Sequence, residues 1–323
     1  RRRAGRPRAA LRGYNPVRTQ RMETETMGVL DDKVAIVTGS ARGIGRATAE
    51  LLSEQGAKVV INDLDGDVAQ QTASEIAGET VVFAGDLTKP GAEDGLIAAA
   101  IDAWGKIDII VNNAGYTLDA PIHKMSDEAF QRMLDIHTIV PFRVLRAAAP
   151  HLREPAKQER DEGREVFRKI VNVSSISGTM GNAGQANYSS GKAGVVGLTK
   201  TLAKEWGQFK INVNAVAFGY IETRLTASKV DENVMEIDGE KVQLGIPDQL
   251  RGMAAMLIPL GRPGTILVRR SAIGHARRAG EFGWHSSKPD GEGRDIGIRK
   301  RRSSFRDLEI RPEHVARNGI AIH

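Results

Sequence analysis

Cysteine is absent from the 323-residue chain. This absence excludes disulfide bonds, thiol nucleophiles and thiolate metal ligands, and we predict no metal site. Long apolar runs are absent as well, since residues 253–260, one of the longest, fall far short of the ~18 residues that a membrane-spanning helix needs. We therefore expect a cytoplasmic protein without a membrane partner.

A uniform charge of one sign is also missing, although the chain has 46 Lys and Arg, 40 Asp and Glu and a net charge of +6. The basic excess lies at the ends: residues 1–26 carry 8 Arg and 2 Glu, and residues 266–323 carry 13 basic and 7 acidic residues. The 25 basic and 31 acidic residues between these ends make the body acidic. The basic composition therefore does not indicate a nucleic-acid-binding body, and we expect no nucleic-acid partner.

The N-terminal segment, residues 1–29, shows no sustained apolar periodicity, and we predict that it is disordered. Its Arg-rich composition is compatible with an organelle transit peptide or with a basic arm for nucleic acid. We favour a third hypothesis, in which residues 1–26 are upstream sequence read through from an early start. Arg, Ala, Gly and Pro all have GC-rich codons, so untranslated GC-rich DNA would give this composition.

From Lys33 onward, short continuous apolar runs alternate with helix-patterned segments. Continuous apolar runs are typical of strands buried on both faces, so the alternation predicts an α/β fold with a parallel sheet between two layers of helices. Six strands are predicted, at residues 34–37, 58–61, 81–84, 107–111, 170–173 and 211–216. Helices are predicted at residues 44–55, 67–76, 93–104, 127–152 and 187–207.

A glycine-rich turn at residues 38–45 (TGSARGIG) follows the first predicted strand and opens the first predicted helix. Backbone N–H groups in such a turn approach a pyrophosphate closely, and the helix N-terminus favours its negative charge. The spacing is G-x3-G-x-G rather than the commoner G-x-G-x-x-G. With a strand before it and a helix after it, the turn is predicted to bind a dinucleotide. The candidate binding residues are Gly39, Ser40, Arg42, Gly43, Ile44 and Gly45.

Two side chains near this turn indicate different cofactors. Asp63, at the end of the second predicted strand, can accept hydrogen bonds from a ribose 2′-OH and repel a 2′-phosphate, which favours NAD. Arg42, inside the turn, can pair with a 2′-phosphate, which favours NADP. We predict NAD as the cofactor and keep NADP as the alternative, because the like charge of Asp63 acts directly at the phosphate.

Tyr188 and Lys192 lie early in a predicted helix at a spacing of i and i+4, so they share one helical face. A neighbouring ammonium stabilises a phenolate and draws the ordinary tyrosine pKa of ~10 toward neutral pH. Such a tyrosine can protonate a carbonyl oxygen or deprotonate an alcohol. Ser175, at the end of the preceding predicted strand, can hydrogen-bond the same oxygen.

Taken together, these motifs resemble those of a known family. TGSARGIG at 38–45, DLT at 86–88, NNAG at 112–115, Ser175 and YSSGK at 188–192 match the short-chain dehydrogenase/reductase family. The resemblance covers about residues 30–265, the predicted dinucleotide-binding domain, and implies a Rossmann-type doubly wound sheet. Residues 178–194 (GTMGNAGQANYSSGKAG) look especially like bacterial 3-oxoacyl-[acyl-carrier-protein] reductases.

The resemblance implies a role for each matching residue. Tyr188 is expected to be the general acid and base, Ser175 to orient the carbonyl, and Lys192 to lower the pKa of Tyr188 and hold the nicotinamide ribose. Val173 is expected behind the nicotinamide. The other expected cofactor contacts are Asp86 and Leu87 beside the adenine, Asn113, Ala114 and Gly115 along the cleft, and Gly219, Ile221 and Thr223 beside the carboxamide.

Two positions depart from the family pattern. His137 stands where the family has a catalytic Asn. Because the family uses the main-chain carbonyl at that position to hold a water, His137 is a candidate catalytic residue. The alternative is a structural role, with the His137 side chain bonded to local backbone. Phe218 replaces a proline that would stiffen its turn.

A larger departure follows Thr265. The family continues with a helix and a seventh strand, and the basic tail at residues 266–323 matches neither. We hypothesise a frameshift after Thr265, with a genuine C-terminal extension as the alternative. We therefore predict six recognisable strands with the usual seventh missing, which leaves the sixth as an open edge. The resemblance implies a homotetramer, and in relatives the missing element builds one of the interfaces.

The predicted function is hydride transfer between NAD(P) and a carbonyl or secondary alcohol. The favoured substrate is a small-molecule or acyl-thioester compound of the 3-oxoacyl or 3-hydroxyacyl class, on the basis of the match at residues 178–194. Two alternatives stay open. The altered C-terminus would allow a catalytically silent nucleotide-binding scaffold, and the substrate could instead be a non-acyl secondary alcohol.

Overall fold

The computed structural model describes residues 28–229, 234–237, 239–246, 248–256, 258–266 and 319–322. Of the two terminal segments at residues 1–29 and 266–323, only residues 28, 29, 266 and 319–322 fall within this description. The hypotheses on disorder, read-through and frameshift therefore concern residues outside it. None of the described helices is long and apolar enough to cross a membrane.

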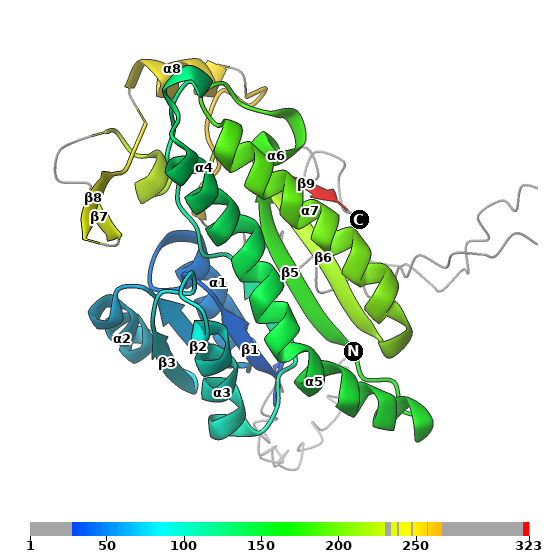
Figure 1. Cartoon of the computed structure of the whole chain (residues 1–323). Helices are drawn as coiled ribbons and strands as arrows, with labels where there is room; N and C mark the ends of the chain where they lie inside the picture. The colour runs from blue at the N-terminus through cyan, green and yellow to red at the C-terminus, as the bar shows by residue number, and fades with distance from the viewer. Residues whose placement is uncertain are drawn as a thin grey trace, which may run out of the picture.

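A parallel sheet forms the centre of the protein (Figure 1). The apolar runs fold as central strands because both of their faces are covered, and every residue of the first and fourth strands is buried. Among the described residues the six parallel strands are β1 (Val34–Val37), β2 (Lys58–Asp63), β3 (Thr80–Ala84), β4 (Ile109–Asn112), β5 (Arg168–Ser175) and β6 (Ile211–Phe218). Their order, β3-β2-β1-β4-β5-β6, confirms the predicted doubly wound arrangement.

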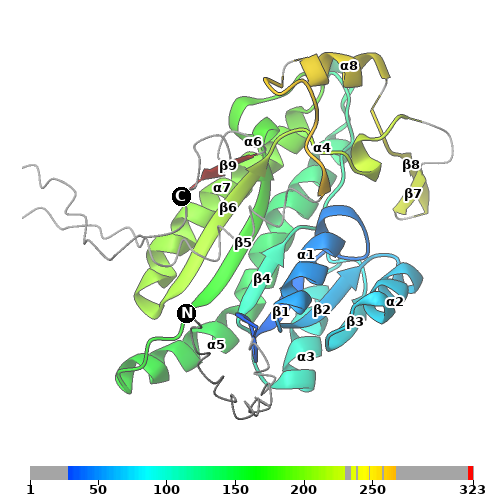
Figure 2. The same ribbon diagram turned by 180° about the vertical axis from the view of Figure 1, so that it is seen from behind.

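Helices cover both faces of this sheet (Figures 1 and 2). Successive side chains of β1 enter different cores because they point to opposite faces. The described α-helices are α1 (Gly43–Glu54), α2 (Gly66–Glu75), α3 (Ala92–Trp104), α4 (Asp127–Leu134), α5 (Val140–Asp161), α6 (Ile176–Met180), α7 (Ala186–Trp206) and α8 (Asp248–Met256). Val34 and Ile36 pack under α3, α5 and α7, whereas Ala35 and Val37 pack under α1 and α2.

The edge of β6 that we expected to stay open is partly paired. Strand β9 (Gly319–Ile322) runs antiparallel to residues 215–218, with Gly319 opposite Phe218. An unpaired strand edge presents free N–H and C=O groups to any extended segment, which explains how a short run from the C-terminal tail becomes a seventh strand. Phe218 also pairs with Ser175 of β5 on its other side. In place of proline it therefore continues the strand.

The helix predicted at residues 127–152 is divided into two parts. Between α4 and α5 lies a π-helical turn at Asp135–Ile139, in which the Val140 N–H donates to the Asp135 carbonyl. Pro141 follows at the start of α5 and has no N–H to donate. The missing donor favours the wider turn, which carries His137.

A hairpin after β6 was not predicted from the sequence. Strands β7 (Val234–Ile237) and β8 (Glu240–Gln243) pair antiparallel. The hairpin rests on the body through Met235 and Val242, which pack against the core. Arg132 of α4 also donates to Glu240 at 2.7 Å.

A buried ion pair joins the end of α5 to the start of β5, and it gives a test of the fold. Arg168 binds Glu159 through two N–O contacts of 2.7 and 2.9 Å, and only 7% and 13% of the two side chains are exposed. The Glu159→Ala variant should lose about 3 kcal/mol of unfolding free energy at pH 7, because it leaves a buried guanidinium without its partner. Asp161→Ala, which breaks an exposed pair with Arg160, should cost under about 1 kcal/mol.

Urea unfolding curves of the two variants check this prediction. Hydrogen bonds from Arg168 hold the pKa of Glu159 below its ordinary value. The stabilisation is therefore complete above the ordinary glutamate pKa of ~4.3 and is lost as the pH falls through the lower, folded value. Equal losses for the two variants at pH 7 would contradict the assigned strength of the buried pair.

Candidate active site

The glycine-rich turn lies between β1 and α1, at the carboxyl edge of the sheet. Gly39 and Gly43 have positive φ angles of 61° and 58°, a region that glycine enters without strain. A Cβ atom on Gly39 would lie 2.8 Å from Ala114 Cα, and one on Gly45 would collide with the Gly39 carbonyl. The turn therefore requires glycine, and its close-packed backbone fits the cradle that a dinucleotide pyrophosphate needs.

The N-terminus of α1 fits a phosphate as well. Its N-cap residue, Arg42, makes no side-chain capping bond, and the first turn of this fully described helix contains no acidic residue. The first N–H groups of a helix carry partial positive charge. Of the other predicted residues of the turn, Ser40 is buried and its hydroxyl accepts the Asn62 N–H of β2, and Ile44 packs against the core.

Asn113 fixes the shape of the turn from the end of β4. Its Nδ2 donates to the carbonyls of Thr38 at 2.9 Å and Gly39 at 3.0 Å. In return, Thr38 Oγ1 accepts the N–H groups of Asn113 and Ala114. The NNAG motif therefore acts as a frame for the glycine turn.

Asp63 and Arg42 lie together at the edge of the turn, and Asp65 joins them. The Asp63 carboxylate accepts the N–H groups of Ala41 at 3.1 Å and Asp65 at 3.3 Å. Arg42 donates to Asp65 at 2.8 Å, and this hydrogen bond holds the pKa of Asp65 below its ordinary value. Arg224 also interacts electrostatically with Arg42 and both aspartates. Asp65 was not predicted from the sequence, where only the strand end drew attention.

Asp86 and Leu87 follow β3 and shape its loop. The Asp86 carboxylate accepts the N–H of Thr88 at 2.9 Å and its hydroxyl at 2.7 Å. The side chain of Leu87 is buried in the core. A contact between these residues and an adenine would therefore come from the exposed side of the loop.

Helix α7 brings Tyr188 and Lys192 to the end of β5. The Ser175 side chain, at the last residue of β5, hydrogen-bonds the Tyr188 hydroxyl. Lys192 Nζ lies 5.8 Å from the centre of the Tyr188 ring and donates to the Val173 carbonyl at 2.7 Å. The structure therefore brings together the three side chains that the sequence indicates for proton transfer.

Loss of hydration controls the protonation of Tyr188 and Lys192. The surrounding protein removes most of the water from the Tyr188 hydroxyl and raises the pKa of Tyr188 to about 12, although the Ser175 hydrogen bond acts in the opposite direction. Burial lowers the pKa of Lys192 to about 7. We expected the ammonium to draw the Tyr188 pKa toward neutrality. The structure differs, because burial destabilises the ammonium itself, which bonds the Val173 carbonyl.

His137 is buried beside Tyr188. The two rings meet edge to face, with centroids 4.9 Å apart and planes at 89°. His137 Nε2 lies 2.8 Å from the carbonyl of Tyr116, so Nε2 carries the proton, because a carbonyl only accepts. Nδ1 has no hydrogen-bond partner among the described residues. Burial, and next the charge of Lys192, hold the pKa of His137 well below its ordinary value, so the ring is neutral.

The segment after β6 approaches the glycine turn. The methyl group of Thr223 lies 4.0 Å from the position of a Cβ atom on Gly43. Ile221 is buried and forms a β-bridge with Gly264. Gly219 has open space around its Cβ position in the described structure. Of these three predicted residues, Thr223 is therefore the one that the structure places directly against the turn.

Two polar residues next to Tyr188 were not predicted. Asn187 accepts the Tyr188 N–H at 2.8 Å and donates to the Leu118 carbonyl at 2.8 Å. Gln185 donates to Asp119 at 2.9 Å. Both lie within the GTMGNAGQANYSSGKAG stretch, but Leu118 and Asp119 are distant from them in the sequence, so only the fold reveals these two contacts.

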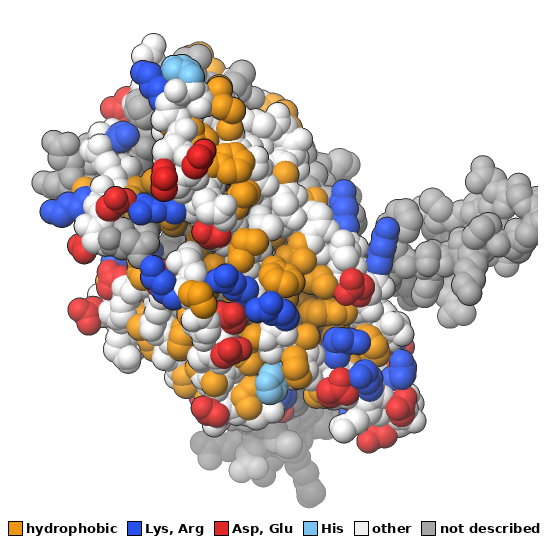
Figure 3. Space-filling model, in the orientation of Figure 1, with side chains coloured by type: hydrophobic (Ala, Val, Ile, Leu, Met, Phe, Trp, Pro, Cys, Tyr) orange, Lys and Arg blue, Asp and Glu red, His pale blue; other side chains and the backbone are white. Residues whose placement is uncertain are grey.

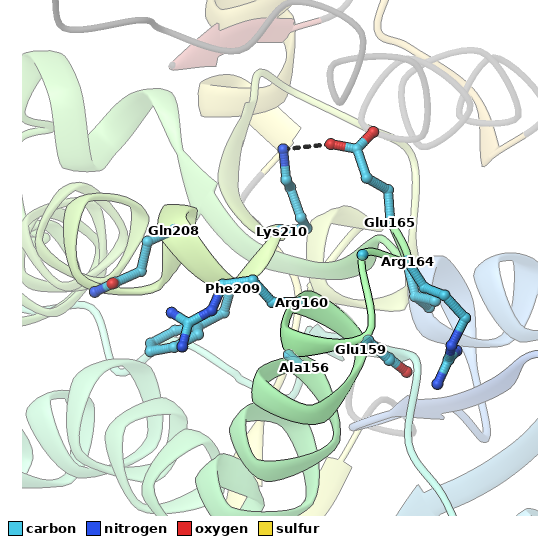
Figure 4. A pocket seen from close by; sticks show the side chains of 10 residues that line it. Ala156, Glu159, Arg160, Arg164, Glu165, Gln208, Phe209 and Lys210 are labelled. Carbon is cyan, nitrogen blue, oxygen red and sulfur yellow. Dashed lines mark ion pairs between the residues drawn. The ribbon is translucent and has the colours of Figure 1, made fainter.

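A hollow at the opposite end of the sheet carries charged side chains (Figure 4). It lies where α5 ends and where β5 and β6 begin, whereas the glycine turn and Tyr188 lie at the carboxyl ends of the strands. Its three cations are already paired: Lys210 binds Glu165 and Arg164 binds Glu162, both at 2.6 Å, and Arg160 binds Asp161 at 3.3 Å. We therefore assign no part of the chemistry to this hollow.

Charges of both signs are interspersed on the face that carries α3 and α5, and neither sign dominates it (Figure 3). The described residues contain no group of three or more His, Cys, Asp and Glu side chains placed to hold a metal ion.

A family model described as short chain dehydrogenase matches residues 33–234. Because this match spans more than half of the chain, the protein belongs to the short chain dehydrogenase family. It is accordingly an NAD(P)-dependent oxidoreductase.

Named relatives and a solved structure agree with this family. A 3-oxoacyl-[acyl-carrier-protein] reductase FabG of Vibrio cholerae is 41% identical over 63% of this chain and 79% of that protein. A 3-oxoacyl-[acyl-carrier-protein] reductase of Synechocystis is 37% identical over 72% of this chain and 91% of that protein. The hydroxyacyl-CoA dehydrogenase ChsB1 of Mycobacterium tuberculosis is 40% identical over 58% and 61%. The crystal structure of a short chain dehydrogenase from Mycobacterium avium is 36% identical, covers 59% of this chain and 69% of that chain, and has a TM-score of 0.55.

The lowered pKa of Lys192 predicts a pH dependence of stability. The folded protein releases the Lys192 proton near pH 7, whereas the unfolded chain keeps it up to the ordinary lysine value of ~10.4. The unfolded state therefore binds more protons between these limits, and Lys192 makes stability rise with pH. Melting temperatures of ligand-free wild type and of Lys192→Met should diverge in slope between pH 7 and 9, with the rise smaller in the variant.

Lys200→Met provides the matched control, because Lys200 lies exposed on the same helix. It should keep the wild-type pH dependence. A Lys192→Met profile parallel to that of the wild type would contradict the lowered pKa.

Proposed function

We propose that residues 30–265 catalyse hydride transfer between NAD and a 3-oxoacyl or 3-hydroxyacyl thioester. The observation that carries this proposal is the contact group of Ser175, Tyr188 and Lys192, which lies at the same edge of the sheet as the glycine turn. Such a group can hold a carbonyl oxygen and exchange a proton with it. The cofactor, when bound, supplies or accepts the hydride at the substrate carbon.

Tyr188 handles the substrate proton in this proposal. For reduction, its raised pKa of about 12 keeps the hydroxyl protonated, so that it can donate to the carbonyl oxygen as negative charge develops there. Ser175 already hydrogen-bonds this hydroxyl and is placed to hold the same oxygen. For oxidation, Tyr188 must lose its proton, and a charged Lys192 nearby favours that step.

Lys192 is held between strand β5 and Tyr188. Its Nζ donates to the Val173 carbonyl, which fixes the ammonium 5.8 Å from the centre of the Tyr188 ring. A lysine whose pKa is lowered to about 7 changes its charge near physiological pH, and any anion that binds nearby will favour the charged form. Lys192 therefore acts on Tyr188 most strongly when the site is occupied.

His137 positions these groups rather than titrating itself. Its neutral imidazole donates to the Tyr116 carbonyl, in the loop that follows the NNAG motif, and its ring edge packs against Tyr188. The bond reaches a distant segment, so His137 differs from the expected structural alternative of a bond to local backbone. We assign His137 to placing Tyr188, with no change of charge at neutral pH.

Two aspartates support NAD over NADP. Asp63 and Asp65 place negative charge at the end of β2, where a 2′-phosphate would be repelled. Arg42, the side chain that would favour NADP, is ion-paired to Asp65 at 2.8 Å. A 2′-phosphate would therefore have to compete with an existing partner for the guanidinium.

The substrate class is supported by the relatives. Two bacterial proteins named 3-oxoacyl-[acyl-carrier-protein] reductases and one named a hydroxyacyl-CoA dehydrogenase match at 37–41% identity. Two of these names describe an acyl thioester with a keto group on C3, and the third describes an acyl thioester with a hydroxyl group. We therefore propose acetoacetyl-CoA and 3-hydroxybutyryl-CoA as the first substrates to assay.

Tyr188→Phe tests the proposed function directly. Without the hydroxyl, the rate of NADH-dependent reduction of acetoacetyl-CoA should fall roughly 100- to 10,000-fold, the usual contribution of a general acid. Binding of NAD, measured by titration, should be retained. Tyr220→Phe is the control, because the Tyr220 hydroxyl contacts none of the three residues of this group: it donates to the Thr226 carbonyl at 3.1 Å and accepts from Arg251 at 3.3 Å. Near-wild-type turnover in Tyr188→Phe would overturn the mechanism, and NAD binding without any wild-type turnover would favour the silent scaffold.

Asp65→Asn tests the cofactor preference. Removing the carboxylate frees Arg42 for a 2′-phosphate, so the dissociation constant for NADP should fall about fivefold to tenfold relative to that for NAD. Isothermal titration with each nucleotide measures this ratio without any turnover. Asp67→Asn, which removes an exposed charge from the same helix, should leave the ratio unchanged. An unchanged ratio in Asp65→Asn would show that the ion pair does not control the preference.

A further inference from the structure

The loop after β4 is joined to the start of α7 along its length. We call residues 116–120 the 116–120 loop. The Leu118 carbonyl accepts from Asn187 at 2.8 Å, and the Ala120 N–H donates to the Gly184 carbonyl at 2.9 Å. Asn187 also accepts the Tyr188 N–H. The loop therefore holds the residues that come immediately before Tyr188.

Asp119 adds a contact between two side chains to this connection between the 116–120 loop and α7. Its Oδ2 accepts from Gln185 Nε2 at 2.9 Å. The other side-chain atom of that amide, Gln185 Oε1, accepts from Ser177 and Asn182, both at 3.0 Å. Ser177 in turn donates its N–H to the Ser175 hydroxyl at 3.2 Å. Gln185 thus connects the loop, α6 and the neighbourhood of Ser175.

Gln185 controls the first turn of the helix that carries Tyr188. It is the N-cap residue of α7, and its side chain makes no capping bond to its own helix. Its carbonyl accepts the Ser189 N–H at 2.8 Å, in the turn that contains Tyr188. A carboxylate that fixes the Gln185 side chain therefore fixes the beginning of this turn.

Titratable groups approach Tyr188 from three segments. Lys192 comes from α7, His137 from the π-helical turn, and Asp119 from the 116–120 loop. His137 is neutral, as described above. Asp119 adds to desolvation in raising the pKa of Tyr188. Asp119 itself reaches solvent. Partial loss of hydration raises the pKa of Asp119, whereas hydrogen bonds from Gln185 and Thr117 and the charge of Lys229 lower it.

We propose that Asp119 is a positioning residue for Tyr188: its carboxylate anchors the start of α7 by accepting the hydrogen bond from Gln185. The inference rests on the proposed function of Tyr188. Asp119→Asn keeps an oxygen that accepts the Gln185 hydrogen bond, whereas Asp119→Ala removes it, so the two variants isolate the anchoring contact.

The conservative variant Asp119→Asn tests whether the accepting oxygen is what matters. In NAD-dependent oxidation of 3-hydroxybutyryl-CoA, its kcat should stay within about threefold of the wild-type value, because its side-chain oxygen still accepts the Gln185 hydrogen bond. Melting temperature and NAD affinity should stay at wild-type values. Asp102→Asn is the charge-matched control, since Asp102 is exposed near the end of α3, away from the carboxyl edge of the sheet. A kcat in Asp119→Asn as low as that of Asp119→Ala would overturn the anchoring through this oxygen.

The anchoring is tested with Asp119→Ala and Gln185→Ala. Each should lower kcat about tenfold, with KM changed less than about threefold, because Tyr188 loses alignment while substrate contacts remain. The double variant should lose no more than Gln185→Ala alone, because that substitution already removes the contact with Asp119. Wild-type kcat in Asp119→Ala, or additive losses in the double variant, would overturn the anchoring. If the alanine variants do not fold, Gln185→Glu decides the proposal: it sets a second carboxylate against Asp119 and should also lower kcat about tenfold, and a wild-type kcat there would overturn the anchoring.

The result for Tyr188→Phe separates the two levels of inference. If Tyr188→Phe keeps its turnover, the proposed function fails, and the inference on Asp119 fails with it. If Tyr188→Phe is inactive while Asp119→Ala and Gln185→Ala match the wild type in kcat, the inference on Asp119 alone is overturned.

Discussion

Tyr188 and Lys192 lose much of their hydration where α7 packs against β5, and the site is arranged around that loss. Water would otherwise stabilise a charged lysine and compete for the phenolic oxygen. The protein replaces it with the Val173 carbonyl for the ammonium and the Ser175 hydroxyl for the phenol. Because each substitute comes from β5, the sheet fixes both groups relative to each other, and a bound reactant meets an oriented pair.

This packing depends on small residues along α7. A Cβ atom on Gly191 would lie 2.8 Å from the Met133 carbonyl, and one on Gly194 would lie 2.7 Å from the Thr138 hydroxyl. Thr138 and Ser174 also donate to the Gly191 and Lys192 carbonyls, both at 2.8 Å. Close approach and hydrogen bonding together place the helix, and so place its side chains. The π-helical turn belongs to the same surface, since it carries both His137 and Thr138.

The features predicted from sequence are those with local causes. Continuous apolar runs locate the six parallel strands, and the glycine turn requires its glycines for steric reasons that the spacing already indicates. The roles of individual site residues stay predictions. Strand β9 was not predicted, because four residues within an unpatterned tail carry no periodic signal and their partner is distant. The Arg42–Asp65 ion pair and the upward pKa of Tyr188 arise from tertiary packing, which the spacing of residues does not encode.

The central claim is that one substrate oxygen is held by Tyr188 and Ser175 beside a dinucleotide on the glycine turn. A crystal structure of the full chain with NAD and acetoacetyl-CoA tests it most directly. We expect the keto oxygen within hydrogen-bond distance, about 2.6–3.2 Å, of both hydroxyls, with the pyrophosphate at the N-terminus of α1. A keto oxygen that contacts neither hydroxyl, or a dinucleotide bound away from residues 39–45, would contradict the claim.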